Sequence, residues 1–207
     1  MKTLLLTSQG LNVKDEILKI LPKPPRELNL IHITTASKDK KDKSYVARDT
    51  KALKDLGFNV KELDLLGLTE SKLRELFKNT DIIYVQGGNT FYLIKCVKES
   101  GFDKVVKSLI NKGTIYIGKS AGTYIACPTI KQSSWKHDQN KSGLMDLNGL
   151  SLVPFIIYVH YVLGDKEILK EKIPTCDYEV KILTDSQAIL VQDDNYKLVG
   201  KGPEIKI

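Results

Sequence analysis

The feature that most constrains the fold is the alternation of two hydrophobic patterns along the chain up to Ser120. Short apolar runs rich in β-branched residues alternate with segments whose apolar residues recur at helical spacing. Such alternation is typical of a parallel sheet covered by helices on both faces. The predicted strands are Lys2–Thr7, Leu28–Thr35, Asn59–Leu65, Asp81–Gln86 and Thr114–Ile117, and the predicted helices are Val13–Leu21, Ser44–Leu56, Glu70–Lys78, Thr90–Glu99 and Phe102–Asn111.

The last third of the chain has a different pattern. Its apolar runs are short and follow one another with little helix between them, which favours antiparallel strands at an edge of the same sheet. These predicted strands are Gly149–Val153, Phe155–Val159, Tyr178–Leu183, Ala188–Gln192 and Tyr196–Gly202, with one helix at Asp165–Ile173. No linker, repeat or low-complexity segment interrupts the sequence. We therefore expect a single domain, residues 1–207, of the α/β class: a three-layer, mostly parallel sheet with helices on both faces and antiparallel C-terminal edge strands.

The composition argues against membrane and nucleic-acid partners. No apolar run approaches the roughly 20 residues of a membrane-spanning helix, and Leu4–Leu6 is too short for the core of a signal peptide. We therefore predict a cytoplasmic location. The formal net charge is +7, and the densest basic run, Ser37–Ser44, interleaves lysines with aspartates and contains no aromatic residue. This run is typical of a solvated loop, and no nucleic-acid-binding motif accompanies it.

The cysteines and histidines give no metal-binding pattern. Cys96, Cys127 and Cys176 are widely spaced, which argues against a disulfide framework as well. The three histidines are scattered, and no carboxylate pair flanks them at ligand spacing. We expect reduced cysteines, no metal site and no cofactor.

A Gly-x-Ser-x-Gly pattern follows the strand at Thr114–Ile117. Gly118 and Gly122 remove Cβ atoms where the chain would turn sharply from strand to helix, which exposes Ser120 in a strained conformation. The N–H group of Ala121 could then stabilise an oxyanion. The pattern fits either a serine nucleophile or a tight turn with a small residue.

A serine nucleophile needs a base, and position along the chain favours His160. It follows the apolar run Phe155–Val159, and groups at strand ends of α/β sheets often carry the chemistry. His32 lies within an apolar strand and is expected in the core. His137 lies in a polar segment and is expected at the surface.

A second group of backbone donors is predicted after the strand Asp81–Gln86. Gly87 and Gly88 allow close approach to a substrate, and Asn89 precedes a helix. Gly87, Gly88 and Asn89 therefore fit an oxyanion or substrate-binding loop. They also fit a turn in which Asn89 or Thr90 caps the helix, and both can be true together.

Three blocks together resemble the serine peptidase family of aspartyl dipeptidase (peptidase E) and cyanophycinase. They are "YVQGGNTFYLI", "IGKSAGTYIACPTI" and "GLSLVPFIIYVH", in this order. The resemblance implies a sheet like that of class I glutamine amidotransferases and a Ser-His-acid triad that contains Ser120 and His160. It also implies an oxyanion hole from the N–H groups of Gly88 and Ala121, and a small peptide as substrate.

The sequence departs from the family pattern at three places. Asp185 is the carboxylate in the segment where the family carries its third triad residue, and Gln187 lies where some relatives have glutamate. Asp185 is the favoured acid, and Gln187 is an alternative orienting group without charge. Asp138 is a candidate for an aspartate that the family carries where this chain has Trp135. Val159 replaces a proline before the histidine.

Two functions follow. The first is a serine-type peptidase that hydrolyses small peptides, with N-terminal aspartate as one candidate specificity. The second is a catalytically weak homologue that binds a peptide or an amino-acid derivative. Lys119 or Lys166 could supply charge for an acidic substrate, since no arginine lies near His160 in the sequence. An α/β-hydrolase esterase is disfavoured because its acid precedes its histidine. The sequence indicates no particular oligomeric state.

Overall fold

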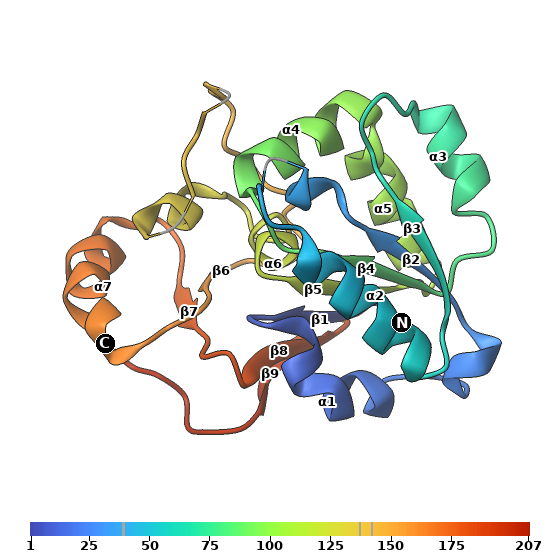
Figure 1. Ribbon diagram of the computed structural model, residues 1–207. Coiled ribbons are helices and arrows are strands. Elements are labelled where there is room, and N and C mark those ends of the chain that lie inside the picture. The colour runs from blue at the N-terminus through green and yellow to red at the C-terminus, as the bar shows by residue number, and fades with distance from the viewer. Residues whose placement is uncertain (39, 137, 142) are drawn as a thin grey trace.

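A central seven-stranded sheet organises the chain, as seen in a computed structural model that describes residues 1–38, 40–136, 138–141 and 143–207 (Figure 1). The strand order is β3-β2-β4-β5-β1-β8-β9. The five strands from β3 to β1 are parallel, and β8 and β9 are antiparallel. The strands are β1 (Thr3–Thr7), β2 (Asn29–Ile33), β3 (Asn59–Leu63), β4 (Ile82–Val85), β5 (Ile115–Lys119), β8 (Gln187–Gln192) and β9 (Asn195–Gly200).

Helices cover both faces of this sheet, and most lie within two residues of the predicted bounds. They are α1 (Lys14–Lys19), α2 (Ser44–Asp55), α3 (Glu70–Leu76), α4 (Thr90–Ser100), α5 (Phe102–Asn111), α6 (Ala121–Tyr124) and α7 (Lys166–Lys172). Short 3₁₀ helices occupy Gly10–Val13, Pro25–Glu27, Thr35–Ser37, Lys131–Trp135, Leu163–Asp165 and Ile173–Thr175. Within the described ranges, no helix is long and apolar enough to cross a membrane.

The two faces of the sheet bury different sets of side chains. In β1, Leu4 and Leu6 pack with α3, α4 and α5, whereas Leu5 packs with α1 and α2 on the other face. The same alternation divides β4, where Ile83 and Ile82 face opposite sides. Figure 1 shows these helices as two layers on either side of the sheet. The predicted three-layer α/β fold is confirmed.

The prediction that all five late strands extend the main sheet is wrong for three of them. β6 (Ile156–Tyr158) and β7 (Val180–Ile182) pair with each other in parallel and form a separate two-stranded sheet. Gly149–Val153 forms no strand. Leu150 and Leu152 donate backbone hydrogen bonds to Ile125 and Ala126, just after α6. These runs are apolar because they pack on the core beside the sheet.

Strand order brings three loops together at one edge of the sheet. β5 lies between β4 and β1, and all three strands run in the same direction. Their carboxyl ends lead into Gly87, Ser120 and Ser8. In parallel sheets, this edge is where functional side chains collect.

Candidate active site

Ser120 occupies a sharp turn between β5 and α6. Its backbone angles are φ 50° and ψ −105°, a conformation that residues with a Cβ rarely adopt. Its carbonyl accepts hydrogen bonds from the N–H groups of Thr123 and Tyr124, and its own N–H donates to Thr7 at 3.1 Å. A Cβ on Gly122 would lie 2.3 Å from the carbonyl oxygen of Val85, so this glycine is required for the close packing of the turn.

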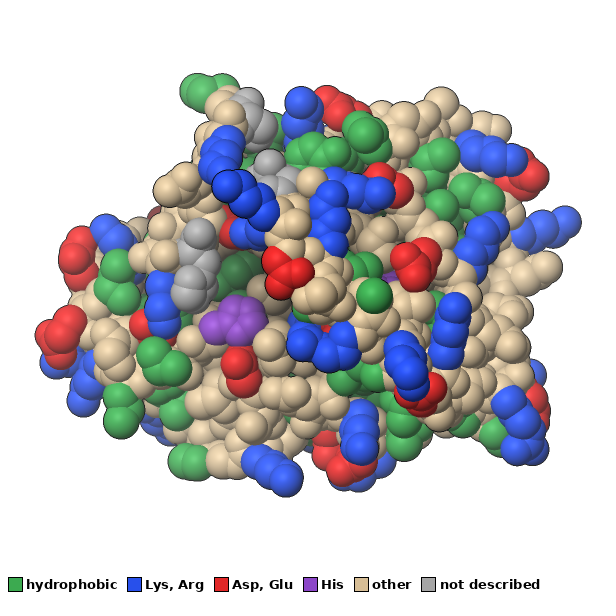
Figure 2. Space-filling view, in the orientation of Figure 1, with side chains coloured by type: hydrophobic (Ala, Val, Ile, Leu, Met, Phe, Trp, Pro, Cys, Tyr) green, Lys and Arg blue, Asp and Glu red, His purple; other side chains and the backbone are tan. Residues whose placement is uncertain are grey.

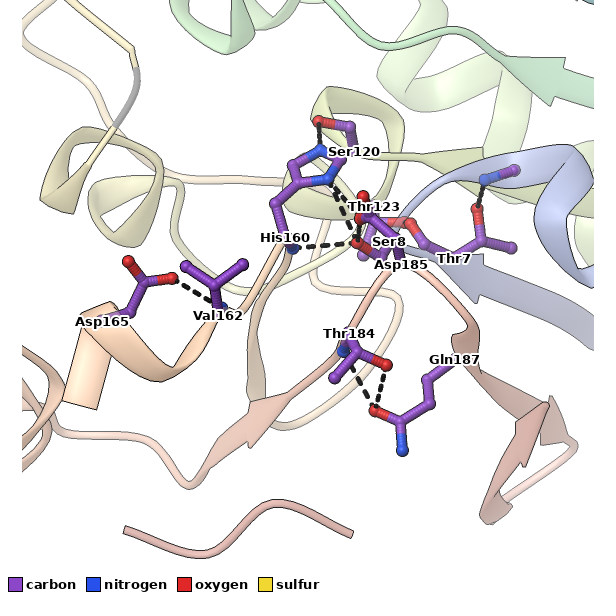
Figure 3. A network of polar contacts seen from close by, with 11 residues as sticks. Thr7, Ser8, Ser120, Thr123, His160, Val162, Asp165, Thr184, Asp185 and Gln187 are labelled. Carbon is purple, nitrogen blue, oxygen red and sulfur yellow. Dashed lines mark hydrogen bonds and ion pairs between the residues drawn. The ribbon is translucent and has the colours of Figure 1, made fainter. Parts of the chain in front are cut away.

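His160 faces Ser120 from the loop that follows β6. Its Nε2 lies 2.9 Å from Ser120 Oγ, and its Nδ1 lies 2.6 Å from Asp185 Oδ1 (Figure 3). The backbone of His160 has a φ of 59°, in the left-handed region. The three side chains form one continuous chain of contacts in the order that activates a serine: nucleophile, imidazole, carboxylate.

Ser8 joins this group and was not predicted from the sequence. Its hydroxyl donates to Asp185 Oδ1 at 2.7 Å and accepts the backbone N–H of His160 at 2.8 Å (Figure 3). Ser8 is fully buried and directly follows β1. The sequence signal for Ser8 was a polar residue at the end of a predicted strand. Its place beside Ser120 could be predicted only with knowledge that β1 pairs with β5.

Gly87 and Gly88 form a loop beside Ser120. A Cβ on Gly87 would lie 3.0 Å from Ser120 Cβ, and a Cβ on Gly88 would lie 2.1 Å from the carbonyl oxygen of Ala36. Neither position accommodates a larger residue without displacement. Neither the N–H of Gly88 nor that of Ala121 donates to another of the described residues, so both are candidates to bind a ligand.

Asn89 and Asp138 hold the start of α4. Asn89 Oδ1 accepts the N–H of Tyr92 at 2.9 Å, and Asn89 Nδ2 donates to the carbonyl of Gln139. Asp138 Oδ2 accepts both the N–H and the hydroxyl of Thr90. These contacts make Asn89 a helix cap and give Asp138 a structural contact with the same helix, and the substrate-binding role of Asn89 stays a prediction.

Gln187 stabilises the turn that carries Asp185. Its Oε1 accepts the N–H and the hydroxyl of Thr184, and its Nε2 donates to the carbonyls of Gly202 and Pro203. The side chain is therefore occupied by the backbone around β8. The alternative prediction was that Gln187 orients His160, and none of these contacts involves His160.

A pocket of about 410 Å³ opens beside Ser120 and His160. Figure 2 shows lysine and arginine side chains gathered near the exposed histidine ring. The lining residues are Gln9, Lys40, Lys41, Asp42, Tyr45, Arg48, Gly87, Gly88, Lys119, Ser120 and His160. The predicted solvated loop at Ser37–Ser44 therefore contributes to the wall of this pocket.

The cations of the pocket differ in their partners. Lys119 is buried, and its Nζ lies 2.5 Å from the buried carboxylate of Asp49, so this charge is already neutralised. Arg48 is 70% exposed and lies 3.9 Å from the other oxygen of Asp49. Arg48 is the arginine in the pocket lining, although it is distant from His160 in the sequence. Lys166 begins α7 and is not part of that lining.

Tyr45 closes one side of the pocket. Its hydroxyl donates to the carbonyl of Gly87 at 3.4 Å, and Lys119 Nζ lies 5.8 Å from its ring centre. Burial raises the pKa of Tyr45 to about 12, so the hydroxyl remains a donor at neutral pH.

The other histidine and Trp135 lie elsewhere. His32 is fully buried, as predicted, and the prediction for His137 falls outside the described residues. Trp135 stacks on Tyr158 with ring centres 6.0 Å apart. Over the described ranges, no group of three or more His, Cys, Asp or Glu side chains is arranged to hold a metal ion.

Comparison with known proteins identifies the family. Residues 4–199 match peptidase family S51. The chain belongs to peptidase family S51. It is an enzyme of the serine peptidase type, and the predicted resemblance to the peptidase E family is confirmed.

Named relatives of this family S51 peptidase agree with that assignment. It is 35% identical over 166 residues to peptidase E of a Nostoc species, an alignment that covers 77% of this chain and 66% of that protein. It is 34% identical to an uncharacterized peptidase of Listeria innocua, over 78% of this chain and 79% of the relative. A solved structure of a candidate peptidase E from Listeria monocytogenes superimposes with a TM-score of 0.87 at 30% identity, covering 98% of this chain and all of that one.

Proposed function

We propose that the protein hydrolyses small peptides through an acyl-enzyme, with Ser120 as nucleophile, His160 as general base and Asp185 as the carboxylate that orients it. The observation that carries this proposal is the unbroken chain of contacts from Ser120 Oγ to His160 Nε2 and from His160 Nδ1 to Asp185. Because Nε2 must accept the serine proton, Nδ1 carries a hydrogen and donates it to Asp185.

The first half of the reaction forms the acyl-enzyme. Ser120 Oγ attacks the carbonyl carbon of the scissile bond as its proton passes to His160 Nε2. The tetrahedral intermediate then collapses. The C–N bond breaks, and His160 gives its proton to the leaving amine.

The second half releases the acid product. Water attacks the acyl carbon and gives a proton to His160 Nε2. The bond between that carbon and Ser120 Oγ breaks, and the proton returns to Ser120. In both halves, the N–H groups of Gly88 and Ala121 are the proposed donors to the oxyanion. Ala121 follows Ser120 in the chain, Gly88 lines the same pocket as Ser120, and neither N–H donates to another of the described residues.

The pocket supports a preference for an acidic substrate side chain, and N-terminal aspartate is the proposed specificity. Lys40, Lys41 and Arg48 border the space beside Ser120. Since Asp49 neutralises Lys119, the exposed guanidinium of Arg48 is the better candidate to bind a carboxylate. The relative from Nostoc carries the name peptidase E.

A dipeptide panel tests this function. Dipeptides with N-terminal Asp, Glu, Asn and Ala are incubated with the wild type and with Ser120→Ala, and release of the C-terminal amino acid is measured. We expect cleavage strongest for Asp-X and a loss of several orders of magnitude in Ser120→Ala. Cleavage that survives in Ser120→Ala would refute the mechanism.

Reactivity of Ser120 separates the peptidase from a homologue that only binds peptides. A fluorophosphonate probe should label the wild type covalently at Ser120 and leave Ser120→Ala unlabelled. A correctly folded wild type that resists the probe and cleaves no dipeptide would favour the binding function.

Arg48 provides a separate test of specificity. Arg48→Gln should raise KM for Asp-X roughly 10-fold with little change for Ala-X, because one charge-assisted hydrogen bond is lost. Arg26→Gln is a matched control, since Arg26 is also an exposed arginine but lies outside the pocket lining. Equal KM values for wild type and Arg48→Gln would exclude this arginine from substrate binding.

A further inference from the structure

We propose that Ser8 is a positioning residue of the catalytic site, which holds the acid and the base in register with the nucleophile. The inference rests on the proposed function, because it gives Ser8 a role only if Ser120, His160 and Asp185 react as described. Ser8 contacts Asp185 through its side chain and His160 through the backbone of the base.

The hydrogen-bond pattern fixes how the Ser8 hydroxyl is used. His160 Nδ1 carries a hydrogen in the reactive tautomer and so cannot accept one. The Ser8 proton therefore goes to Asp185 Oδ1, 2.7 Å away, although Nδ1 lies only 3.3 Å from Ser8 Oγ. Ser8 Oγ in turn accepts the backbone N–H of His160. One hydroxyl thus donates to the acid and accepts from the base.

Both partners of Ser8 lie outside the strands of the main sheet. His160 follows the small β6–β7 sheet, which does not pair with the main sheet. The side chain of Asp185 is 48% exposed, and it lies in a turn before β8. Two backbone bonds join these segments to each other: the N–H of Tyr161 donates to Leu183, and the N–H of Leu183 donates to Tyr158. The Ser8 hydroxyl links the Asp185 side chain and the His160 backbone to the end of β1 in the main sheet.

Ser8 is itself held rigidly. It is fully buried at the end of β1, between the carboxyl end of β5 and the start of β8. The preceding residue, Thr7, accepts the N–H of Ser120 through its carbonyl. Two adjacent residues, the last of β1 and the one that follows it, therefore contact the nucleophile, the base and the acid. A fixed support of this kind preserves the geometry that catalysis requires.

The effect of removing the hydroxyl is measured as reactivity of Ser120 and as turnover. In Ser8→Ala, the rate constant for labelling by a fluorophosphonate probe should fall about 10- to 100-fold, and kcat should fall to a similar extent with KM nearly unchanged. Ser100→Ala is the matched control. Ser100 is also buried, donates to the carbonyl of Val97 and accepts a backbone N–H, but it lies at the end of α4 remote from Gly88. We expect similar losses of Tm in the two variants and a loss of reactivity in Ser8→Ala alone.

A double-mutant cycle distinguishes positioning from general stabilisation. If Ser8 acts through Asp185, Ser8→Ala should have little further effect on labelling in an Asp185→Asn background. Wild-type labelling by Ser8→Ala, or effects of the two substitutions that multiply fully, would overturn the inference. Failure of the wild type to react with the probe would instead refute the proposed function, and the role of Ser8 with it.

Discussion

At the scale of single residues, the site depends on backbone conformations that are unfavourable in isolation. Ser120 and His160 both have positive φ angles. Such conformations cost on the order of 1–3 kcal/mol each and persist only where the surrounding structure fixes them. Around Ser120, the fixing contacts come from Thr7 on one side and from Thr123 and Tyr124 on the other. The strain presents Ser120 Oγ to His160 instead of burying it in the turn.

Asp185 is predicted to contribute through its charge. Asp185→Asn keeps the size of the side chain but removes the charge that stabilises an imidazolium, so kcat should fall roughly 10³-fold with a small change in KM. Steady-state kinetics on a cleaved dipeptide provide the measurement. Asp194→Asn, in the exposed turn between β8 and β9, is the control and should retain wild-type kcat. Full activity in Asp185→Asn would require another group to orient His160.

At the scale of elements, the loops after parallel strands carry most of the site, and local contacts hold each loop. Asp138 and Asn89 cap α4, the helix that follows Gly87 and Gly88. Gln187 closes the turn from Thr184 that contains Asp185. These side chains are near Ser120 or Asp185, but their polar atoms bond the backbone, the hydroxyls of Thr90 and Thr184, and Lys40. Proximity to the site therefore does not by itself make them catalytic.

Gln187→Glu tests the structural role of Gln187. A carboxylate there would be buried and would face the carbonyls of Gly202 and Pro203 in place of the donated bonds, so the free energy of unfolding should fall by about 2–4 kcal/mol. Gln192→Glu, at the exposed end of the same strand, should cost less than about 0.5 kcal/mol. Urea denaturation measures both. A stable Gln187→Glu variant with raised kcat would support the orienting role instead.

At the scale of the whole molecule, a buried polar layer lies under the pocket between the sheet and α2. It contains Asp49, Lys119, Gln86 and His32. Gln86 Nε2 donates to Asp49 at 2.8 Å, and His32 Nδ1 contacts the hydroxyl of Thr50 at 3.0 Å. Burial lowers the pKa of His32 to about 4, an effect that Glu62 and Asp49 only partly offset. The folded protein therefore keeps His32 neutral over most of the physiological range.

This lowered pKa predicts acid destabilisation. The unfolded chain binds a proton at His32 below a pH of about 6.5, whereas the folded chain binds it only near pH 4. The free energy of unfolding therefore has its full value from this histidine above a pH of about 6.5 and declines as the pH falls from there to about 4. The loss from this histidine should reach about 3 kcal/mol. Urea denaturation at pH 7 and pH 4.5 should show a larger decrease for the wild type than for His32→Gln. The same decrease in both proteins would show that His32 does not titrate in this way.

The sequence by itself determined the elements and the chemical groups of the site. Periodicity located the parallel strands and their helices, because burial of one or both faces of an element imposes a local pattern of apolar residues. The sheet to which β6 and β7 belong was predicted wrongly, because an apolar run shows that a strand is buried but not which strand it pairs with. The motifs around Gly88 and Ser120 predicted a nucleophile and its donors, and chain position together with the family resemblance pointed to His160 and Asp185.

Only the tertiary structure decided how distant groups meet. Ser8 and His160 are separated by most of the chain, and their contact depends on the position of β1 beside β5 and β8. Arg48 lines the pocket because α2 packs beside it. Lys119 is not available to bind a substrate because it forms an ion pair with Asp49. Local patterns record which residues are buried. The partner of each polar group depends on strand order and on loop packing, which join residues that no short segment contains.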